Sequence, residues 1–402
     1  MPITPFDSEL CEIRRRDGRL DEAAAHGRRA VTLDPSDPAG WYNLGLVLYD
    51  RLEVTASIAC ERRAVRLRPD WPGPHFELAE GLLLSGQWEE GWREYEWRWH
   101  LPGVPPLVPP PIWERHGRTA ARPWDGRSLP GGTLLLVADQ GFGDTIQFAR
   151  YLPMAAALCP NLVVACSPDI RPVIRALPGG HRAVTAWEEA PPFDAYAALS
   201  SLPGLFGTRI DTIPAPLPGL RAEPERVERW MERLDGLLPH GYRRVGLVWA
   251  GRPTHGNDRN RSLTLARLAP FFALEKTALV SLQKGPAQAE AARYYGTAPL
   301  VDLGSELESF ADTMAVLALL DHVVCVDTAV AHLAGAMGRP TAVLLPYAPD
   351  WRWLLGRGGT PWYPTVTLHR QPAPARWDEA IRSAVAAVTG RKLTASGRPS
   401  RR

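Results

Sequence analysis

The stretch that decides the fold is Val326-Asp327-Thr328-Ala329-Val330-Ala331-His332-Leu333-Ala334-Gly335-Ala336-Met337-Gly338-Arg339-Pro340. An apolar strand at 322–326 precedes it and another at 341–345 follows it. Asp and Thr favour a helix start, the alanine-rich segment continues the helix, and Gly338 followed by Pro340 ends it. This order predicts a βαβ unit whose helix begins at the carboxyl edge of a parallel sheet. Its unpaired N–H groups and helix dipole would attract an anion, and Thr328 and His332 suggest a diphosphate.

Composition indicates an ordinary globular protein rather than a nucleic-acid or membrane protein. The chain has 402 residues, 45% apolar and 22% charged, with a net charge of +2. Near-neutral charge gives no electrostatic case for nucleic acid. The five cysteines show no metal-like spacing and are expected to be buried thiols in a reducing compartment. No apolar run is long enough to span a membrane, and the sequence from Met1 does not resemble a signal peptide, so a cytoplasmic location is expected.

The first hundred residues repeat with a period of 34. Pro35 and Pro69 correspond, as do Leu44 and Leu78. The period and the helix–turn–helix pattern are those of tetratricopeptide repeats, of which we expect about three, at 4–37, 38–71 and 72–101.

The third repeat ends in an aromatic ridge with i,i+4 spacing, formed by Trp88, Trp92, Tyr95 and Trp99. Either this ridge docks the repeats onto the next domain, or it lines a peptide-binding groove.

Beyond the repeats, apolar strands alternate with helical segments, which predicts two Rossmann-like domains. The predicted division is 1–101 tetratricopeptide repeats, 102–129 proline-rich linker, 130–222 N-terminal Rossmann-like domain, 223–242 interdomain helix, 243–390 C-terminal Rossmann-like domain, and 391–402 disordered basic tail. The fold class is therefore an α-helical solenoid followed by two facing α/β domains, the GT-B plan.

Between the first strand and helix of the N-terminal domain lies Asp139-Gln140-Gly141-Phe142-Gly143-Asp144. Gly141 and Gly143 would let the backbone approach a ligand. Asp144 is either only a helix cap or a general base. The segment does not match the GxGxxG fingerprint, so NAD is not expected.

Basic residues follow two strands of the C-terminal domain. A loop begins at Gly251 and contains Arg259 and Arg261; it is either a phosphate-binding loop or a solvated charged one. Lys284, one of only three lysines, could neutralise a leaving diphosphate or lie on the surface of a turn. His332 alone would more often be a packed core residue, and Asp327 could cap the helix or bind a ribose.

Aromatic residues after 345 are candidates for stacking a nucleobase. We single out Trp351 and Trp353; packing against the N-terminal domain is the alternative. The sequence has no DxD pair, HExxH motif or cysteine–histidine cluster, so no metal or other cofactor is expected.

Six blocks together resemble bacterial tetratricopeptide-linked glycosyltransferases: DQGFGDTIQFARYLP, FDAYAALSSLPGLFGTRIDTIPAP, GLVWAGRPTHGNDRNRSL, SLQKGP, VDTAVAHLAGAMGRP and PYAPDWRWLLGRGGTPWYPTVTLHRQ. The catalytic part is similar to glycosyltransferase family 9, the ADP-heptose:lipopolysaccharide heptosyltransferases. The arrangement of repeats and catalytic domain also resembles that of O-GlcNAc transferases. The resemblance covers roughly residues 10–390.

The resemblance implies an inverting, metal-independent transfer from a nucleotide-diphospho-sugar. It matches Asp144 to the proposed general base, and Asp327, Thr328 and His332 to the D-T-x-x-x-H donor motif. Lys284 is comparable to a phosphate-binding lysine of O-GlcNAc transferases. Heptosyltransferases usually have Gly where this chain has Ala329, and more often Lys where it has Arg259 and Arg261.

These observations predict a sugar transferase that takes its donor in the C-terminal domain and its acceptor, a protein or glycan, through the repeat arm. Two other functions stay open. One is an inactive GT-B scaffold that binds a partner through its repeats, and the other is a nucleotide-sugar epimerase.

Overall fold

The computed structural model describes residues 4–179, 181–217 and 219–390. The chain forms two compact units. The repeat unit contains the chain up to Pro106 together with two later segments, Pro203–Thr212 and Ala348–Gly356. The α/β unit contains Leu107–Leu202, Ile213–Tyr347 and the chain from Arg357 onward.

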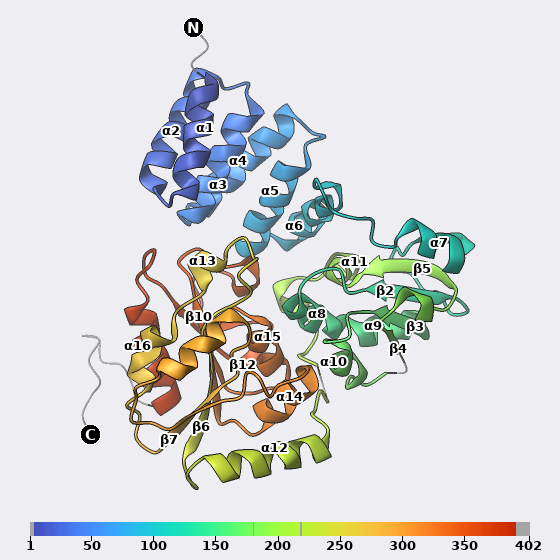
Figure 1. Cartoon of the computed structure of the whole chain (residues 1–402). Helices are drawn as coiled ribbons and strands as arrows, with labels where there is room; N and C mark the ends of the chain where they lie inside the picture. The colour runs from blue at the N-terminus through green and yellow to red at the C-terminus, as the bar shows by residue number, and fades with distance from the viewer. Residues whose placement is uncertain (1–3, 180, 218, 391–402) are drawn as a thin grey trace. The chain divides into compact units, whose positions relative to one another are not determined.

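The repeat unit is built from three antiparallel helix pairs (blue in Figure 1). Their bounds are α1 Thr4–Arg16, α2 Leu20–Leu33, α3 Pro38–Asp50, α4 Val54–Leu67, α5 Pro72–Leu84 and α6 Trp88–Tyr95, with the 3₁₀ helix η1 at Glu96–His100. The Asp37 side chain accepts from the backbone N–H groups of Ala39 and Gly40, and so caps α3. The predicted helix–turn–helix repeat is confirmed.

The aromatic ridge of α6 packs against the two later segments of the repeat unit. Trp92 Nε1 donates to the carbonyl of Thr208 at 2.9 Å, and the Trp92 ring meets the Trp351 ring edge-on at 5.3 Å between centroids. Tyr95 also contacts the Trp351 ring. These contacts join the ridge to later segments of the repeat unit itself, so they decide neither alternative, docking onto the next domain or lining a peptide-binding groove. Trp99 makes a different contact, donating to the Glu96 carboxylate.

The N-terminal sheet of the α/β unit has the order β1-β5-β2-β3-β4, and all its pairs are parallel. Its strands are β1 Gly117–Pro123, β2 Thr133–Val137, β3 Asn161–Ala165, β4 Arg182–Val184 and β5 Phe193–Ala198. Its helices are α7 Pro110–His116, α8 Phe142–Phe148, η2 Ala149–Tyr151, α9 Leu152–Leu158, α10 Arg171–Arg175, η3 Trp187–Glu189, η4 Leu199–Ser201 and α11 Leu202–Leu205, and η5 Ile210–Thr212 follows in the repeat unit.

Part of the segment expected to be a linker without regular structure belongs to this sheet. Residues 110–123 form α7 and β1, and β1 pairs in parallel with β5. Proline density misled the prediction, because the prolines lie mainly before α7 and β1 gains its hydrogen bonds from a distant strand. The domain therefore begins earlier than residue 130.

The C-terminal sheet has the order β11-β12-β10-β9-β6-β7-β8 and is parallel except for β11. Its strands are β6 Arg243–Val248, β7 Thr277–Ser281, β8 Leu300–Asp302, β9 His322–Val326, β10 Thr341–Leu345, β11 Gly359–Thr360 and β12 Tyr363–Arg370. Its helices are α12 Pro224–Leu237, α13 Asp258–Arg261, η6 Leu265–Phe271, η7 Pro286–Arg293, α14 Phe310–Ala318, α15 Ala329–Ala336 and α16 Asp378–Thr389, and η8 Trp351–Trp353 lies in the repeat unit. Strands such as β7 and β10 are buried along their whole length, as expected for a parallel sheet covered on both faces.

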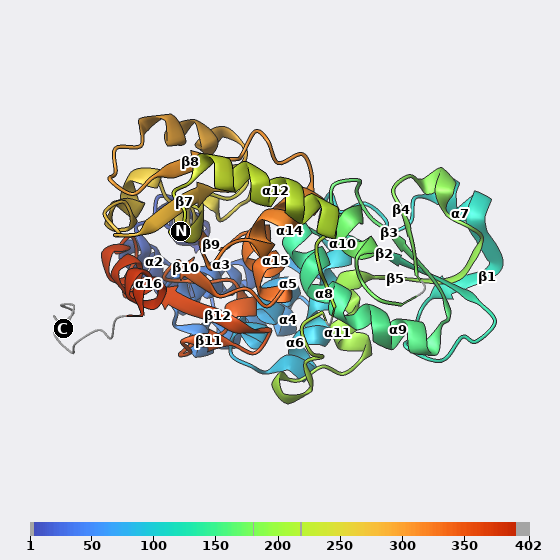
Figure 2. The ribbon, with the colours of Figure 1, turned by 90° about the horizontal axis from the view of Figure 1, so that it is seen from below.

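The opening βαβ prediction is confirmed: β9, α15 and β10 follow one another, and β9 pairs in parallel with β10. A further strand follows Thr341–Leu345, because residues 366–370 of β12 pair in parallel with β10. Figure 2 shows β12 between β10 and β11 at one edge of the sheet.

All five cysteines are buried and none forms a disulfide. Among the described residues, no helix is both long and apolar enough to cross a membrane. The predicted tail, 391–402, lies outside the described residues.

Candidate active site

The predicted donor-binding residues follow three neighbouring strands. β6 pairs in parallel with β9 on one side and with β7 on the other. Gly251 follows β6, Lys284 follows β7 and Asp327 follows β9. Because the carboxyl ends of parallel strands meet at one edge of the sheet, these loops adjoin, which is where open α/β sheets bind ligands.

The start of α15 offers groups that suit an anion. Thr328 is the N-cap residue, but its side chain makes no capping bond, and its Oγ1 is buried without a hydrogen-bond partner among the described residues. The first N–H groups of a helix have no partner within the helix. An unpaired hydroxyl beside unpaired N–H groups is a donor set that fits a phosphate oxygen.

His332 is buried in the second turn of α15, at 4% exposure. A hydrogen bond of 3.0 Å joins its Nδ1 to the hydroxyl of Tyr363 at the start of β12. Its Nε2 lies 4.0 Å from Asp327 Oδ1. The imidazole is thus held between the donor loop and β12, so its orientation is fixed.

The start of α8 lies against α15, as both views show (Figures 1 and 2). A Cβ on Gly143 would stand 2.8 Å from Cδ2 of His332, so only glycine permits this approach. The glycine predicted to allow close approach to a ligand therefore allows the approach of the two domains. The contact brings the loop that carries Asp144 to the donor motif.

Asp144 is the third residue of α8 rather than its N-cap. Its Oδ2 accepts from the N–H of Gly141 at 3.0 Å, the reciprocal half of a capping box. Asp144 therefore caps α8 from the third position of the helix and not from the N-cap position. A carboxylate can accept several hydrogen bonds, so this bond is compatible with a second role as a base.

The basic loop after β6 is ordered by its own side chains. Ser262 Oγ accepts from the Gly251 N–H and donates to Asp258, and Arg261 Nε lies 3.4 Å from the same Asp258 oxygen. A Cβ on Gly251 would stand 2.6 Å from the Arg261 guanidinium. Gly251 is thus required for Arg261 to fold over the loop. Arg259, by contrast, is exposed.

The amide side chain of Gln283 fixes the exit of β6. It accepts from the N–H groups of Trp249 and Ala250 and donates to the carbonyls of Ala250 and Lys284. Gln283 belongs to the SLQKGP block, but the sequence does not indicate that its side chain fixes the exit of β6. All but one of its hydrogen-bond partners are distant in the chain.

Lys284 is engaged with protein groups. Its ammonium donates to the carbonyls of Gly304 and Leu307, in the loop between β8 and α14. The predicted direct contact with a diphosphate would compete with these bonds, so the structure favours a role in holding that loop.

The two tryptophans predicted to stack a nucleobase are fully buried. Trp351 and Trp353 have no exposed area, and Trp351 packs on Trp92 and Tyr95 within the repeat unit. No ring face is accessible to a base, so the geometry favours packing, but against the repeat unit rather than against the N-terminal domain that the alternative named.

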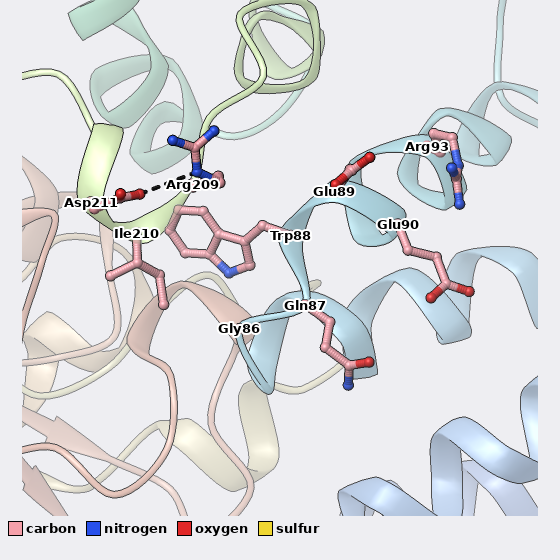
Figure 3. A pocket seen from close by; sticks show the side chains of 9 residues that line it. All are labelled: Gly86, Gln87, Trp88, Glu89, Glu90, Arg93, Arg209, Ile210 and Asp211. Atoms are coloured by element: carbon pink, nitrogen blue, oxygen red, sulfur yellow. Dashed lines mark ion pairs between the residues drawn. The ribbon is translucent and has the colours of Figure 1, made fainter.

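A separate hollow of about 590 Å³ lies in the repeat unit (Figure 3). The start of α6 forms one wall and the segment Arg209–Asp211 the other, with an ion pair between Arg209 and Asp211. None of the predicted site residues lines it. Among the described residues, no group of three or more His, Cys, Asp or Glu side chains could hold a metal ion.

Comparisons with known proteins agree with this architecture. Residues 12–51 match the TPR repeat model, and residues 274–362 match the model of glycosyltransferase family 9 (heptosyltransferase). The second match contains Lys284 and the whole donor motif, but it ends before Tyr363.

In sequence, the chain is 29% identical to protein FlbA of Caulobacter vibrioides (strain ATCC 19089 / CIP 103742 / CB 15) over 363 residues. This alignment covers 84% of the chain and 59% of FlbA, so the chain spans about three fifths of that relative.

Two similar solved structures are a glycosyl transferase family 9 protein from Veillonella parvula DSM 2008 and the ADP-heptose lps heptosyltransferase II of E. coli. The first has a TM-score of 0.48 at 9% identity, covering 66% of this chain and 98% of the other. The second has a TM-score of 0.47 at 14% identity, covering 64% and 98%. The chain thus resembles TPR repeat proteins over residues 12–51 and glycosyltransferase family 9 (heptosyltransferase) over residues 274–362.

Proposed function

We propose that this protein transfers a sugar from a nucleotide-diphospho-sugar to a hydroxyl acceptor, with inversion and without a metal ion. The observation that carries the proposal is the contact between the starts of α8 and α15. It brings Gly143, the neighbour of Asp144, against His332 and Ala329 of the donor motif, and that motif lies in the segment that matches the family 9 model.

In the proposed step, Asp144 takes the proton of the acceptor hydroxyl. The acceptor oxygen forms a bond to the anomeric carbon from the side opposite the diphosphate. The bond between that carbon and the diphosphate oxygen breaks, and the diphosphate leaves with the electron pair. A single displacement of this kind inverts the anomeric centre.

Negative charge that develops on the leaving diphosphate needs fixed positive groups. The first N–H groups of α15 and the unpaired Thr328 hydroxyl supply donors at one side. Arg261 and Arg259, on the neighbouring loop after β6, supply guanidinium groups that match phosphate oxygens. Preorganised donors of this kind can stabilise the charge in the transition state without a metal ion.

The proposed acceptor is a protein or glycan bound through the repeat arm. TPR repeats are helical arrays that offer extended surfaces to partners. In this proposal the repeat unit selects the acceptor while the α/β unit binds the donor.

A catalytically inactive scaffold is the second candidate. Two observations favour it: Lys284 is occupied by carbonyl groups, and the Asp144 carboxylate caps α8. Such a protein would bind partners through its repeats and would not turn over a nucleotide sugar.

The experiment is a panel of UDP-, GDP-, ADP- and dTDP-sugars in excess EDTA, with thermal stability and donor hydrolysis both measured. If the protein is a sugar transferase, one donor should raise its melting temperature. The same donor should be hydrolysed slowly, with water acting in place of the acceptor. Stabilisation without hydrolysis would favour the scaffold. Binding that is lost in EDTA and restored by Mg²⁺ or Mn²⁺ would contradict the metal-free mechanism.

A further inference from the structure

Arg150, in η2 just after α8, is a buried cation that joins the two halves of the α/β unit. It is 2% exposed. Its Nε donates to the carbonyl of Gln147 at 2.8 Å in its own half. Its Nη1 donates to the carbonyls of Trp362 at 3.1 Å and Pro214 at 3.3 Å, and Trp362 immediately precedes β12 of the other half.

The guanidinium also lies over aromatic rings of the C-terminal half. It stands 5.0 Å from the ring centres of both Trp362 and Tyr363. Cations are attracted to ring faces, and more strongly when both groups are desolvated. Arg150 therefore contacts both the backbone and the aromatic side chains at the start of β12.

No carboxylate forms an ion pair with Arg150 within the part of the chain that the structure describes. Its Nη2 is buried and has no hydrogen-bond partner there either. Burying a charge without a counter-ion is costly, and an apolar side chain of similar volume often gives equal or greater stability. Stability alone is thus a poor reason for an arginine at this position.

The contacts of Arg150 lead to the proposed catalytic centre. Arg150 holds Tyr363, whose hydroxyl is hydrogen-bonded to His332 Nδ1. The His332 ring in turn lies against Gly143, the neighbour of Asp144. These contacts form a closed series: Arg150, just after α8, contacts β12, β12 contacts α15, and α15 contacts the start of α8.

We propose that Arg150 is a positioning residue that fixes the placement of Asp144 relative to His332 and the donor loop. This inference rests on the proposed function for its kinetic consequence. Its structural consequence, that Arg150 holds the starts of α8 and α15 together, can be tested without any substrate.

The test compares Arg150→Met and Arg150→Lys with wild type in the full-length protein. Methionine keeps the apolar volume but removes every donor. Lysine keeps a charge and donors for the carbonyls but loses the planar group that covers the rings.

Arg98→Met is the matched control. Arg98 is also buried, at 5% exposure, donates to the backbone carbonyl of Tyr95 and lies over the rings of Tyr95 and Trp99. It differs from Arg150 in that its Nη1 also pairs with the Glu96 carboxylate at 2.7 Å. It belongs to the repeat unit, so its loss should not alter the α/β unit.

The first readout is amide hydrogen exchange in α8 and α15. We expect faster exchange there in Arg150→Met than in wild type, a smaller change in Arg150→Lys, and none in Arg98→Met. Equal exchange in wild type and Arg150→Met would overturn the inference, whatever the activity of the protein.

The second readout is donor hydrolysis, with kcat and KM determined separately. Because the donor contacts belong to the C-terminal half, KM should change by less than about threefold. A displacement of reacting groups by about 1 Å can cost roughly 10²-fold, and we expect a loss of kcat of that order in Arg150→Met with partial rescue in Arg150→Lys. A lower melting temperature with unchanged kcat would show a merely structural role and refute the proposal.

The two readouts separate this inference from the proposed function. If wild type hydrolyses no nucleotide sugar, the proposed function fails and the exchange measurement decides the role of Arg150. If wild type is active and Arg150→Met matches it in both readouts, the inference fails and the proposed function stands.

Discussion

Glu61 in α4 should be replaceable by methionine with a gain in stability. The side chain has no exposed area, and neither carboxylate oxygen has a hydrogen-bond partner among the described residues. It lies against Gly45 of α3, where a Cβ would stand 2.0 Å from Oε1. Burial, with the negative charge of Glu77 adding to it, raises the pKa of Glu61 well above the ordinary value of 4.5.

The expected gain follows from the unpartnered oxygens. A buried polar group without a partner costs about 1–3 kcal/mol, and methionine fills a similar volume without polar oxygens. Glu61→Met should therefore raise the free energy of unfolding of the repeat unit by about 1–3 kcal/mol. For a unit of this size, each kcal/mol corresponds to a rise of roughly 4 °C in melting temperature. Glu61→Gln, which keeps an unpartnered amide, should gain much less.

Because its pKa is raised, Glu61 makes the folded protein less stable as pH rises. Below pH 4.5 both folded and unfolded chains hold the proton, so the raised pKa of Glu61 costs nothing. As pH rises above 4.5 the unfolded chain releases its proton first, so stability falls until the pH passes the raised folded-state pKa. Glu77, whose pKa burial raises to about 7, acts in the same direction between pH 4.5 and 7.

The assay is thermal unfolding of the full chain between pH 5 and 8, followed by circular dichroism. Wild type should lose stability as pH rises. Glu61→Met should lose less, because only the loss that is due to Glu77 remains. Glu9→Met, at an exposed position of α1, is the control and should change stability by less than about 0.5 kcal/mol. A Glu61→Met protein that is less stable than wild type at pH 8 would refute the reasoning.

Three further changes test the site and the repeat unit. Gly143→Ala places a methyl group 2.8 Å from the His332 ring, so it should destabilise the α/β unit by about 1–3 kcal/mol and reduce turnover, whereas Gly131→Ala, with nothing within 4 Å, should be close to neutral in both assays. Arg261→Ala should weaken nucleotide-sugar binding by about 1.5–3 kcal/mol, roughly ten- to a hundredfold in Kd by calorimetry; unchanged affinity would show that the loop points away from the donor. Trp92→Ala removes a buried ring from the repeat unit and should cost about 3–5 kcal/mol in thermal unfolding, and a loss below 1 kcal/mol would show that the ridge contacts are weak.

The sequence predicts strongly patterned elements well. The 34-residue period indicates the helix pairs, and the strands at 322–326 and 341–345 agree with β9 and β10. These elements are recognisable because their apolar residues form uninterrupted or periodic runs bounded by Gly and Pro.

Local sequence pattern does not predict the elements that depend on distant partners. β12 contains Pro364 and several exposed residues, so it reads as a loop, yet β10 beside it supplies its hydrogen bonds. β1 follows a proline-rich segment and is stabilised by β5, about 75 residues later. Local pattern cannot report a partner of this kind.

Within the candidate site, residue types were predicted better than their contacts. The sequence indicates His332 but not its partner Tyr363, because 31 residues separate them. Lys284 looked like a phosphate ligand because lysine is rare in this chain, whereas its carbonyl partners come from the loop after β8. The burial of Trp351 depends on the α6 ridge, which lies about 250 residues earlier.

The most direct test of the central claim is turnover by Asp144→Asn, compared with Asp144→Ala. The Asn side chain can still accept from the Gly141 N–H, so it preserves the cap seen in α8, but it cannot take a proton at neutral pH. If Asp144 is the general base, Asp144→Asn should keep its stability and donor affinity while kcat for sugar transfer falls by roughly 10²–10⁴. If Asp144 only caps the helix, Asp144→Asn should match wild type in rate and stability, and Asp144→Ala alone should lose about 1 kcal/mol of stability; that result would contradict the account.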